Sequence, residues 1–459
     1  MKIAVTGGSG QLGTLVLRRL IADKTIKEVV TIDLRPPVVA GAKMRIIRAD
    51  IRDGKFVNYL QDCEVLVHLA FVVTSYLPRA EFDAINIEGS KNVFRAAAVA
   101  RVQHIVYASS IAAYGTMPGH PVPIVETTPR RCHDSMPYAA AKFRLEEFLD
   151  EFEQEHPNIV VTRLRPAILL GVYMEHPFGQ TLRQRRIVDR GDTPIPIVWD
   201  EDVAEAIILA IRSKGREVRK AHGAFNLAAD DSLPAAELAR IGGLRLLRVP
   251  SWILLPIIYM SIFLARLGVG RAMDPVWLKE AKGEMIISSA KARQELGWQP
   301  RCPTAAEVIK KYVEVVPKRL DPRLARFFRI AGWVARFQRP SPAQQQVSAR
   351  IHLALAGPTG GDFGCSITHG RLSINKNIPR PPTAVARLSA SVLLDLLAGR
   401  ADFTAAQITG KIHFEGEPAG AMFLNTLITN FRTNTTRPGL RGWLARRLAQ
   451  NMDKSQLKS

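Results

Sequence analysis

Residues 2–13 read KIAVTGGSGQLG and are followed directly by a run with helical periodicity, TLVLRRLIA. The first four residues predict a short buried strand, so Gly7, Gly10 and Gly13 fall in a strand–turn–helix unit. In such a unit Gly7 allows the chain to turn, Gly10 lets the backbone approach a pyrophosphate, and Gly13 lets the helix pack on the strand. The helix N-terminus then faces the phosphates with its unpaired N–H groups. The stretch therefore predicts a dinucleotide-binding site.

A second predicted strand, EVVTID, ends at Asp33, twenty residues beyond Gly13. A carboxylate at this point can accept both ribose hydroxyls and would repel a 2′-phosphate, so NAD is favoured over NADP. The nearby Arg35 keeps NADP as the less favoured alternative. Further apolar strands are expected at 44–50, 63–70 and 104–110, each separated by a helical stretch. Alternating β and α segments predict an α/β fold with a doubly wound parallel sheet of the Rossmann type.

A serine pair and a tyrosine–lysine pair are the candidate catalytic groups. Ser110 follows the strand at 104–110, whereas Tyr138 and Lys142 are four residues apart in SMPYAAAKFRLEEFL and project from one helical face. A tyrosine with a pKa near 10 is a weak base at neutral pH, and a lysine ammonium beside it favours the phenolate. Tyr138 would then move a proton while a hydride moves to or from a nicotinamide, and Ser110 would hold the substrate oxygen. The alternative is a solvated helix face.

Residues 1 to about 315 resemble the extended short-chain dehydrogenases of the NAD-dependent epimerase/dehydratase family. The matching motifs, in the order of that family, are TGGSGQLG, Asp50-Ile51, HLA, NIEGSKNV, SSIAAYG and PYAAAK. The resemblance implies that Ser110, Tyr138 and Lys142 are the catalytic triad. One departure is Phe71, which stands where the family usually has a small residue after HLA and which would narrow the pocket.

The same resemblance extends the cofactor site. Asp50 and Ile51 would lie against the adenine, and Leu69, Ala70 and Asn86 would lie along the cofactor. The complete set of expected NAD contacts is Gly7, Gly10, Gln11, Leu12, Gly13, Asp33, Asp50, Ile51, Leu69, Ala70, Asn86, Tyr138 and Lys142. No metal site is expected.

The substrate half carries a weaker signal. Sugar-nucleotide members of the family usually have an asparagine and a Y-G-P where this chain reads RPAILLG, at residues 165–171. This form resembles the steroid, sterol and other hydrophobic-alcohol dehydrogenases, which implies a lipidic secondary alcohol or ketone as substrate. The charge-free run Val249–Ala265 suits a lipid-contacting helix, although periodicity does not separate this from core. A membrane span is a third reading, because seventeen residues are barely long enough.

The rest of the chain predicts further domains. Residues 1–317 form the dehydrogenase with its small substrate subdomain, and 318–349 read as a basic amphipathic helix and linker. This helix suits a membrane interface or docking against the first domain. Residues 350–432 then predict a separate small α+β domain, and 433–459 a basic C-terminal helix and tail.

The stretch LAGRADFTAAQITGKIHFEG, at residues 397–416, gives the C-terminal domain its character. Gly399, Gly410, Lys411 and Gly416 match the pattern of the sterol carrier protein family, which this domain resembles. The resemblance implies an apolar tunnel for lipids, sterols or acyl chains. The alternative is an unrelated α+β domain that mediates dimer contacts.

The bulk composition bounds the partners. The 459 residues carry a net charge of +21, which predicts attraction to polyanions such as an anionic membrane surface. Zinc-finger and RNA-binding signatures are absent from the sequence, so nucleic acid is not expected. Four scattered cysteines, Cys63, Cys132, Cys302 and Cys365, predict free thiols in a reducing compartment. We expect a cytoplasmic protein, with peripheral membrane attachment and a homodimer as open alternatives.

Three functions remain in view at this stage. The leading hypothesis is an NAD-dependent oxidoreductase that acts on a sterol-like or other lipidic alcohol or ketone and receives it from a lipid-binding tail. The second is a nucleotide-sugar epimerase or dehydratase. The third is a non-catalytic, NAD-sensing lipid-binding or transfer protein.

Overall fold

The computed structural model divides the chain into two compact units. The first comprises Met1–Arg35 and Gly41–Tyr312, and the second consists mainly of Val313–Ser459. The structure describes residues 1–37, 39, 41–73, 77–115, 118–131, 134, 136–171, 177–183, 185–213, 220–248, 256, 260, 284–315, 324, 327–328, 349–356, 361–368, 371–375 and 382–435.

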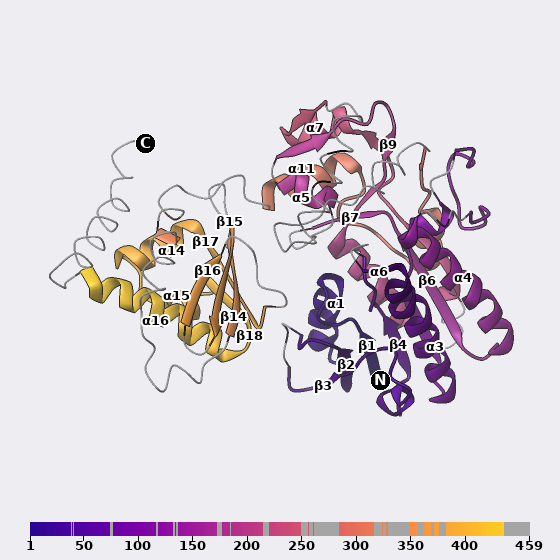
Figure 1. Ribbon diagram of the computed structural model, residues 1–459, viewed down its shortest axis with the longest axis horizontal. Helices are drawn as coiled ribbons and strands as arrows, with labels where there is room; N and C mark the ends of the chain where they lie inside the picture. The colour runs from indigo at the N-terminus through magenta and orange to yellow at the C-terminus, as the bar shows by residue number, and fades with distance from the viewer. Residues whose placement is uncertain are drawn as a thin grey trace. The chain divides into compact units, whose positions relative to one another are not determined.

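A seven-stranded sheet forms the centre of the first unit (Figure 1). Its strands, in spatial order, are β11 (Gly223–Leu227), β6 (Val160–Pro166), β5 (His104–Ala108), β4 (Val65–His68), β1 (Lys2–Thr6), β2 (Glu28–Asp33) and β3 (Met44–Arg48). All six pairings are parallel. The chain order reverses direction between β1 and β4, which makes their carboxyl ends the topological switch point where such sheets bind ligands. The predicted doubly wound Rossmann sheet is confirmed.

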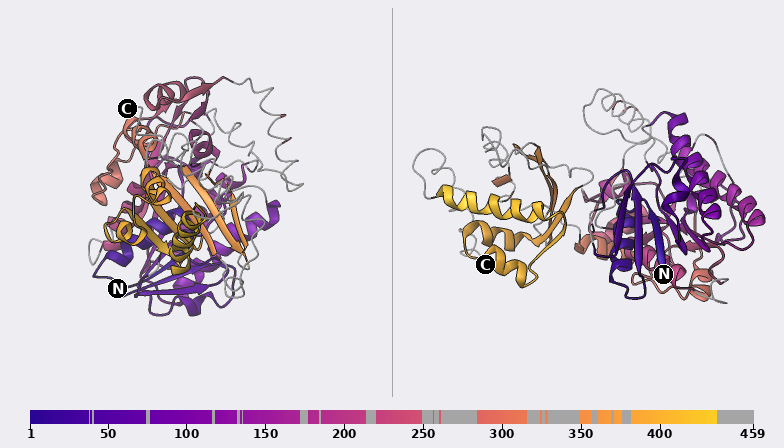
Figure 2. Two further views of the ribbon diagram at one scale, coloured as in Figure 1. Left: turned by 90° about the vertical axis from the view of Figure 1, so that its left-hand side faces the viewer. Right: turned by 90° about the horizontal axis from the view of Figure 1, so that it is seen from below.

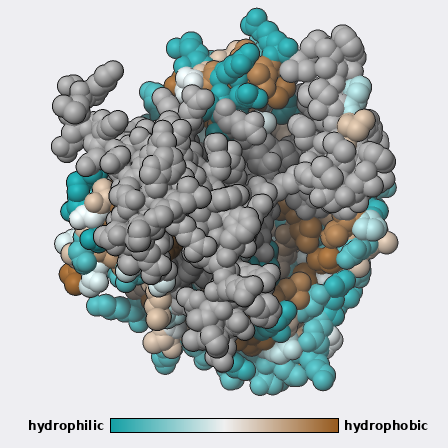
Figure 3. Space-filling view, turned by 60° about the vertical axis from the view of Figure 1, so that its left-hand side comes forward, coloured by the Kyte–Doolittle hydropathy of each residue, from teal (hydrophilic) through white to brown (hydrophobic). Residues whose placement is uncertain are grey.

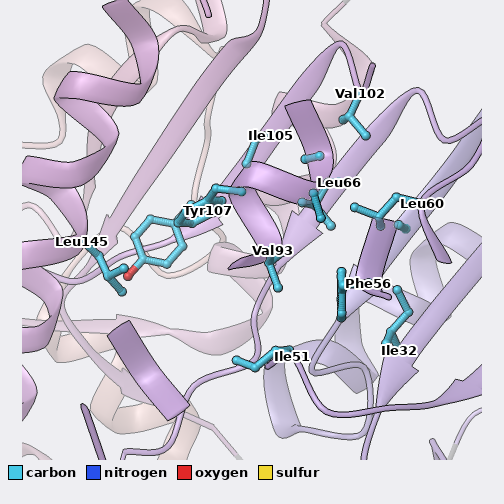
Figure 4. Close-up of a cluster of buried hydrophobic side chains, with 14 of the residues drawn as sticks. Ile32, Ile51, Phe56, Leu60, Leu66, Val93, Val102, Ile105, Tyr107 and Leu145 are labelled. Atoms are coloured by element: carbon cyan, nitrogen blue, oxygen red, sulfur yellow. The ribbon is translucent and has the colours of Figure 1, made fainter. Parts of the chain in front are cut away.

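Helices cover both faces of this sheet (Figure 1). Helix α1 (Gln11–Ala22) packs with α6 (Asp200–Arg212), and α3 (Gly89–Val99) packs with α4 (Pro137–Glu155). Shorter helical segments are η1 (Phe56–Tyr59), α2 (Arg79–Asp83), η2 (Ala84–Glu88) and η3 (Ile111–Tyr114). Figure 4 shows how strand and helix side chains meet in one buried cluster that includes Ile32, Leu66, Ile105, Phe56, Val93 and Leu145.

A small subdomain is built from short strand pairs after β6. These are β7 (Ile168–Leu170) with β10 (Ile197–Trp199), β8 (Arg186–Val188) with β13 (Arg245–Leu247), and β9 (Pro194–Ile195) with β12 (Leu233–Pro234). Its helices are α5 (Pro177–Arg183), α7 (Ala235–Gly242), α10 (Ala290–Glu295) and α11 (Ala305–Val315). Most of the apolar run Val249–Ala265 lies outside the described residues, and Pro256 and Met260 are its only described members. Among the helices that the structure describes, none is long and apolar enough to cross a bilayer.

The second unit is a separate α+β domain, as predicted. Its five strands, in spatial order, are β16 (Arg371–Asn375), β15 (Gly361–Thr368), β14 (Ala349–Ala356), β17 (Ala384–Ser389) and β18 (Ile412–Gly416). Helices α14 (Ala390–Ala398) and α16 (Pro418–Thr435) pack on one face of the sheet, and α15 (Phe403–Ile408) precedes β18 (Figure 2). Gly399 ends α14 with a φ of 75°, the left-handed conformation that favours glycine at a helix C-terminus.

The apolar residues of the helix expected at 318–349 pack against a part of the protein that was not predicted. Leu324, Phe327 and Phe328 are buried in the core of the C-terminal domain. The Phe328 ring stacks on Phe363 with 4.1 Å between centroids, and Phe327 meets Phe431 edge to face at 5.0 Å. The prediction of membrane contact or docking on the first domain is therefore wrong for these three side chains. Packing within the α+β domain removes the apolar surface of these side chains from water.

The surface is mixed in character. On the face in Figure 3, hydrophilic residues line much of the margin and hydrophobic residues gather in smaller patches among them. Exposed large hydrophobic residues in the C-terminal domain include Ile408 and Met422. Single exposed apolar side chains are ordinary on a protein surface, so these two do not by themselves mark a binding site. The expected basic helix at 433–459 lies almost entirely outside the described residues.

Candidate active site

The glycine turn after β1 has the close contacts that the sequence predicts. Gly7 has a φ of 71°, and its N–H donates to the Ile32 carbonyl at 3.1 Å. A Cβ on Gly7 would stand 2.5 Å from the Ala70 nitrogen, and one on Gly13 would stand 2.2 Å from the Gly7 oxygen. Neither position therefore admits a side chain without a shift of the backbone.

The start of α1 is open to an anion. Its N-cap residue is Gly10, which offers no side-chain cap, and the first turn contains no acidic residue. The uncapped N–H groups of this turn, which includes Gln11 and Leu12, carry the positive end of the helix dipole. This helix end, at the switch point of the sheet, fits a dinucleotide pyrophosphate.

Asp33 lies at the end of β2 beside the same turn. Its carboxylate accepts hydrogen bonds from the backbone N–H of Ser9 and of Arg35, both at 3.1 Å. A carboxylate has about four acceptor positions, so capacity remains for the two hydroxyls of a ribose. The Arg35 Nε lies 4.0 Å from the Asp33 carboxylate. This arrangement suits the ribose of NAD, and Arg35 lies beside it.

Asp50 and Ile51 follow β3 and have other partners in this structure. The Asp50 carboxylate pairs with the Arg52 guanidinium at 2.7 Å, and this hydrogen bond lowers the pKa of Asp50. Ile51 is buried, and a Cβ on Gly89 would lie 2.7 Å from its side chain. Ile51 thus belongs to the hydrophobic core, and its contact with adenine stays a prediction.

The loop after β4 is held by buried polar groups. The N–H groups of Leu69 and Ala70 donate to the Thr6 carbonyl at 3.2 Å and the Thr6 hydroxyl at 3.3 Å. Asn86 is fully buried, and its amide bonds Val72 in both directions, at 2.8 and 3.0 Å. Leu69 and Ala70 therefore lie against the glycine turn and Asn86 holds the loop, and the expected contact of all three with the cofactor stays a prediction.

His68 closes this loop from inside the sheet. Its ring nitrogens contact the hydroxyls of Thr6 at 2.7 Å and Ser90 at 2.9 Å. Burial, together with the charge of Lys142, lowers the pKa of His68 to about 3. A neutral histidine that bonds two hydroxyls is a structural group, so the HLA motif serves here to fix the loop.

The three candidate catalytic residues lie on neighbouring elements. Ser110 caps η3, and its hydroxyl oxygen accepts from the Ala112 N–H at 3.1 Å, which leaves its O–H to donate elsewhere. Helix α4, which packs against η3, carries Tyr138 and Lys142. The Lys142 Nζ is 5.9 Å from the centre of the Tyr138 ring. That Ser110 lies close to Tyr138 stays a prediction.

Lys142 is deeply buried, with 2% of its surface exposed. Its Nζ donates to the Ala108 carbonyl at 2.7 Å and to the Tyr107 hydroxyl at 3.2 Å. Burial lowers the pKa of Lys142 to about 7, although the nearby Glu146 carboxylate acts in the opposite direction. The ammonium of this residue therefore titrates near neutral pH, where a proton-transfer site is most responsive.

A buried ion-pair network below the site was not predicted. Glu146 is fully buried, accepts from the Ser109 hydroxyl at 2.5 Å, and pairs with Arg165. Arg165 also donates to the Tyr114 hydroxyl at 2.7 Å. Burial raises the pKa of Glu146, but the hydrogen bonds from Arg165 and Ser109 and the charges of Arg165 and Arg163 together lower it further, so the carboxylate stays ionised. A signal was available in the sequence: Glu146 follows Lys142 by four residues, which places both on one helix face.

The fold and the site together define a Rossmann-type nucleotide-binding domain with a tyrosine–lysine–serine constellation, followed by an α+β domain. Residues 3–228 match the NAD dependent epimerase/dehydratase family. Residues 335–429 match the SCP-2 sterol transfer family. The chain thus joins a domain of the NAD-dependent epimerase/dehydratase family to a C-terminal domain of the SCP-2 sterol transfer family, which confirms both resemblances.

Relatives with similar sequences have diverse names. An uncharacterised protein of Mycobacterium tuberculosis is 26% identical over 66% of this chain and 81% of its own length. A UDP-glucose 4-epimerase of Mycolicibacterium smegmatis is 26% identical over 68% of this chain and 98% of its own. A putative dihydroflavonol 4-reductase of Synechocystis is 25% identical over 64% and 88%.

Solved structures support the fold of the first unit. MoeE5 in complex with UDP-glucuronic acid and NAD has a TM-score of 0.53 at 20% identity, covering 68% of this chain and 98% of its own. The UDP-glucose 4-epimerase of Thermotoga maritima with UDP-glucose has a TM-score of 0.51 at 22% identity, with the same coverage. At this identity the likeness concerns the fold, and the substrate has to be argued from the residues.

Proposed function

We propose that the N-terminal domain is an NAD-dependent oxidoreductase that interconverts a hydrophobic secondary alcohol and its ketone, and that the C-terminal domain binds the lipid. The observation that carries the proposal is the pairing of Tyr138 and Lys142 on one face of α4, the helix that packs against η3 with its Ser110 cap. A tyrosine close to a buried lysine, together with a serine hydroxyl free to donate, suits proton transfer at a substrate oxygen.

The cofactor site favours NAD. The uncapped N-terminus of α1 would hold the pyrophosphate, and Asp33 would accept the ribose hydroxyls. Bound NAD supplies the hydride acceptor for alcohol oxidation. Residues 3–228 match a family whose description names NAD, which further supports this cofactor.

The side chains of this protein divide the remaining work among them. The Tyr138 oxygen takes the hydroxyl proton of the alcohol as the carbon–hydrogen bond breaks, and returns it in the reverse direction. The Lys142 ammonium favours the phenolate form of Tyr138, because a nearby positive charge stabilises the anion. The Ser110 O–H donates to the substrate oxygen and holds it in line. The neutral His68, and Asn86 through its hydrogen bond with Val72, fix the loop that follows β4.

The lipidic nature of the substrate rests on the domain combination. A domain of the SCP-2 sterol transfer family is tethered to the oxidoreductase domain within one chain. Tethering raises the effective concentration of a carried, poorly soluble molecule at the oxidoreductase domain, and it does not require a channel. The relative named as a putative dihydroflavonol 4-reductase bears the name of a reductase, which supports the oxidoreductase part of the proposal.

A nucleotide-sugar epimerase is the second candidate, favoured by the UDP-glucose 4-epimerase relative, of which the alignment covers 98%. Against it stands the sequence RPAILLG, which lacks the asparagine and Y-G-P of the sugar-nucleotide members. A non-catalytic lipid carrier that senses NAD is a third candidate. It gives no reason for a tyrosine–lysine pair at a buried charged site.

The test is turnover by the purified full-length chain. NADH formation is followed with sterols and long-chain secondary alcohols, and UDP-galactose formation from UDP-glucose is followed by chromatography. We expect oxidation of an apolar alcohol and its loss in Tyr138→Phe, while the Tyr59→Phe control, which removes a hydroxyl bonded to Asp53 on the surface, stays active. Epimerisation of the sugar without alcohol oxidation would overturn the substrate assignment, and full activity of Tyr138→Phe would overturn the mechanism.

A further inference from the structure

Phe71 is fixed in the loop that follows β4. On one side, the Ala70 N–H donates to the Thr6 hydroxyl at 3.3 Å. On the other side, the buried Asn86 amide both accepts from and donates to the Val72 backbone, at 2.8 and 3.0 Å. The backbone around Phe71 is therefore held at two adjacent residues, and its ring has a defined direction.

The face of the Phe71 ring meets the Lys142 ammonium. The Nζ atom lies 3.7 Å from the ring centre, closer than it lies to the Tyr107 ring at 4.8 Å or the Tyr138 ring at 5.9 Å. An ammonium has three donors, and two of those on Lys142 go to the Ala108 carbonyl and the Tyr107 hydroxyl. The electron-rich face of the Phe71 ring is thus a further partner of the buried Lys142 ammonium.

The same ring also contacts Tyr138. The two ring centres are 5.5 Å apart and the planes meet at 82°, an edge-to-face pair. Phe82 of α2 supports Phe71 from another side, edge to face at 6.4 Å. Phe71 therefore connects the lysine to the tyrosine, which itself is four residues away along α4.

We propose that Phe71 is a positioning residue that holds Lys142 in its charged form and fixes the Tyr138 ring beside it. An aromatic side chain there supplies a cation–π contact that a small residue cannot. The catalytic consequence rests on the proposed oxidoreductase function, whereas the effect on the charge of Lys142 does not.

The charge of Lys142 depends on several groups that surround it. Glu146, on the same helix, favours the ammonium, and His68 from β4 is neutral because of its burial. Tyr107 from β5 accepts from Nζ, and burial raises the pKa of Tyr107 well above its usual value, so its hydroxyl stays protonated. Phe71 itself carries no charge, so replacing it leaves the number of charged groups around Lys142 unchanged.

The measurement is the titration of Lys142 in the full-length protein with ¹³Cε-labelled lysine, and the resonance is assigned by its loss in Lys142→Met. Removing the π face in Phe71→Leu, or in Phe71→Met, is expected to lower the titration midpoint by about one unit, since a buried cation–π contact is lost. Phe71→Tyr keeps an aromatic face and should keep the midpoint. Phe82→Leu removes a packing partner of Phe71 and is the matched control for packing alone.

An unchanged midpoint in both Phe71→Leu and Phe71→Met would overturn the proposal, as would an equal fall in Phe82→Leu. If the midpoint falls as expected, the alkaline limb of the kcat profile should move with it to lower pH, because the charged lysine is the active form, while KM changes less. A fall of the midpoint in a chain that oxidises no alcohol supports the role of Phe71 and refutes the proposed reaction, so the two failures are distinguishable.

Discussion

Replacing Glu146 by Gln removes the charge from one side of a deeply buried ion pair and keeps the size of the side chain. Glu146 is 0% exposed and Arg165 is 4% exposed. Arg165 binds both carboxylate oxygens through its Nε, at 2.9 and 3.2 Å, and its other polar contacts are the neutral Tyr114 hydroxyl and Glu126 carbonyl. The substitution therefore leaves a guanidinium buried without its counter-charge.

The magnitude follows from the cost of such an orphan. Breaking a buried ion pair by removing one partner costs about 3–5 kcal/mol of unfolding free energy, most of it from the charge that remains. The partners of Glu146 differ in how much they depend on it: Arg163 keeps Asp150 and Glu153, so its charge stays compensated. We therefore place the expected loss for Glu146→Gln near the lower end, about 3 kcal/mol.

The assay has to report on the first unit alone, because a two-domain chain does not unfold in one step. Hydrogen exchange of peptides from β6, followed along a urea titration, gives that local free energy. The control is Glu237→Gln, whose partner Arg240 is 74% exposed and whose pair contributes roughly 0–1 kcal/mol. A loss below 1 kcal/mol in Glu146→Gln, or losses of equal size in the two variants, would refute the reasoning.

Two further predictions concern pH and salt. His68 has its folded pKa lowered to about 3 from an unfolded value of 6.5, so the unfolded state binds the extra proton between these values and the first unit should lose stability as pH falls below 6.5. His68→Gln should reduce the slope of unfolding free energy against pH below 6.5, and an unchanged slope would contradict this. With a net charge of +21, the chain should co-sediment with anionic vesicles at low salt and release as salt rises. Binding that is insensitive to salt would show that charge is not its cause.

Much of the fold could be predicted from short windows of the sequence. The glycine spacing at Gly7, Gly10 and Gly13 fixed a strand–turn–helix unit, because close approach and left-handed backbone are properties of single positions. The alternation of apolar strands with helical segments implied the parallel sheet that the structure has. In the C-terminal domain, the left-handed Gly399 likewise ends a helix.

The sequence could predict which residues belong to the candidate site, but not how they are surrounded. Tyr138 and Lys142 were expected on one helix face because their spacing is local. Their surroundings were not foreseen: Lys142 bonds Tyr107 and Ala108 and lies over Phe71, all brought to it from other elements. Sequence spacing carries no information about which distant side chains share a buried space.

The sequence by itself determined the local turns, the order of the elements and the identity of the two domains. The tertiary structure alone decided how buried charges and rings are paired. Glu146 and Arg165 are 19 residues apart in the chain, yet they meet between α4 and β6. Leu324, Phe327 and Phe328 read as one side of an amphipathic helix, and packing assigns them to the core of the C-terminal domain. Periodicity shows that a face will be buried, but the partner that buries it depends on the free energy of the whole packed domain.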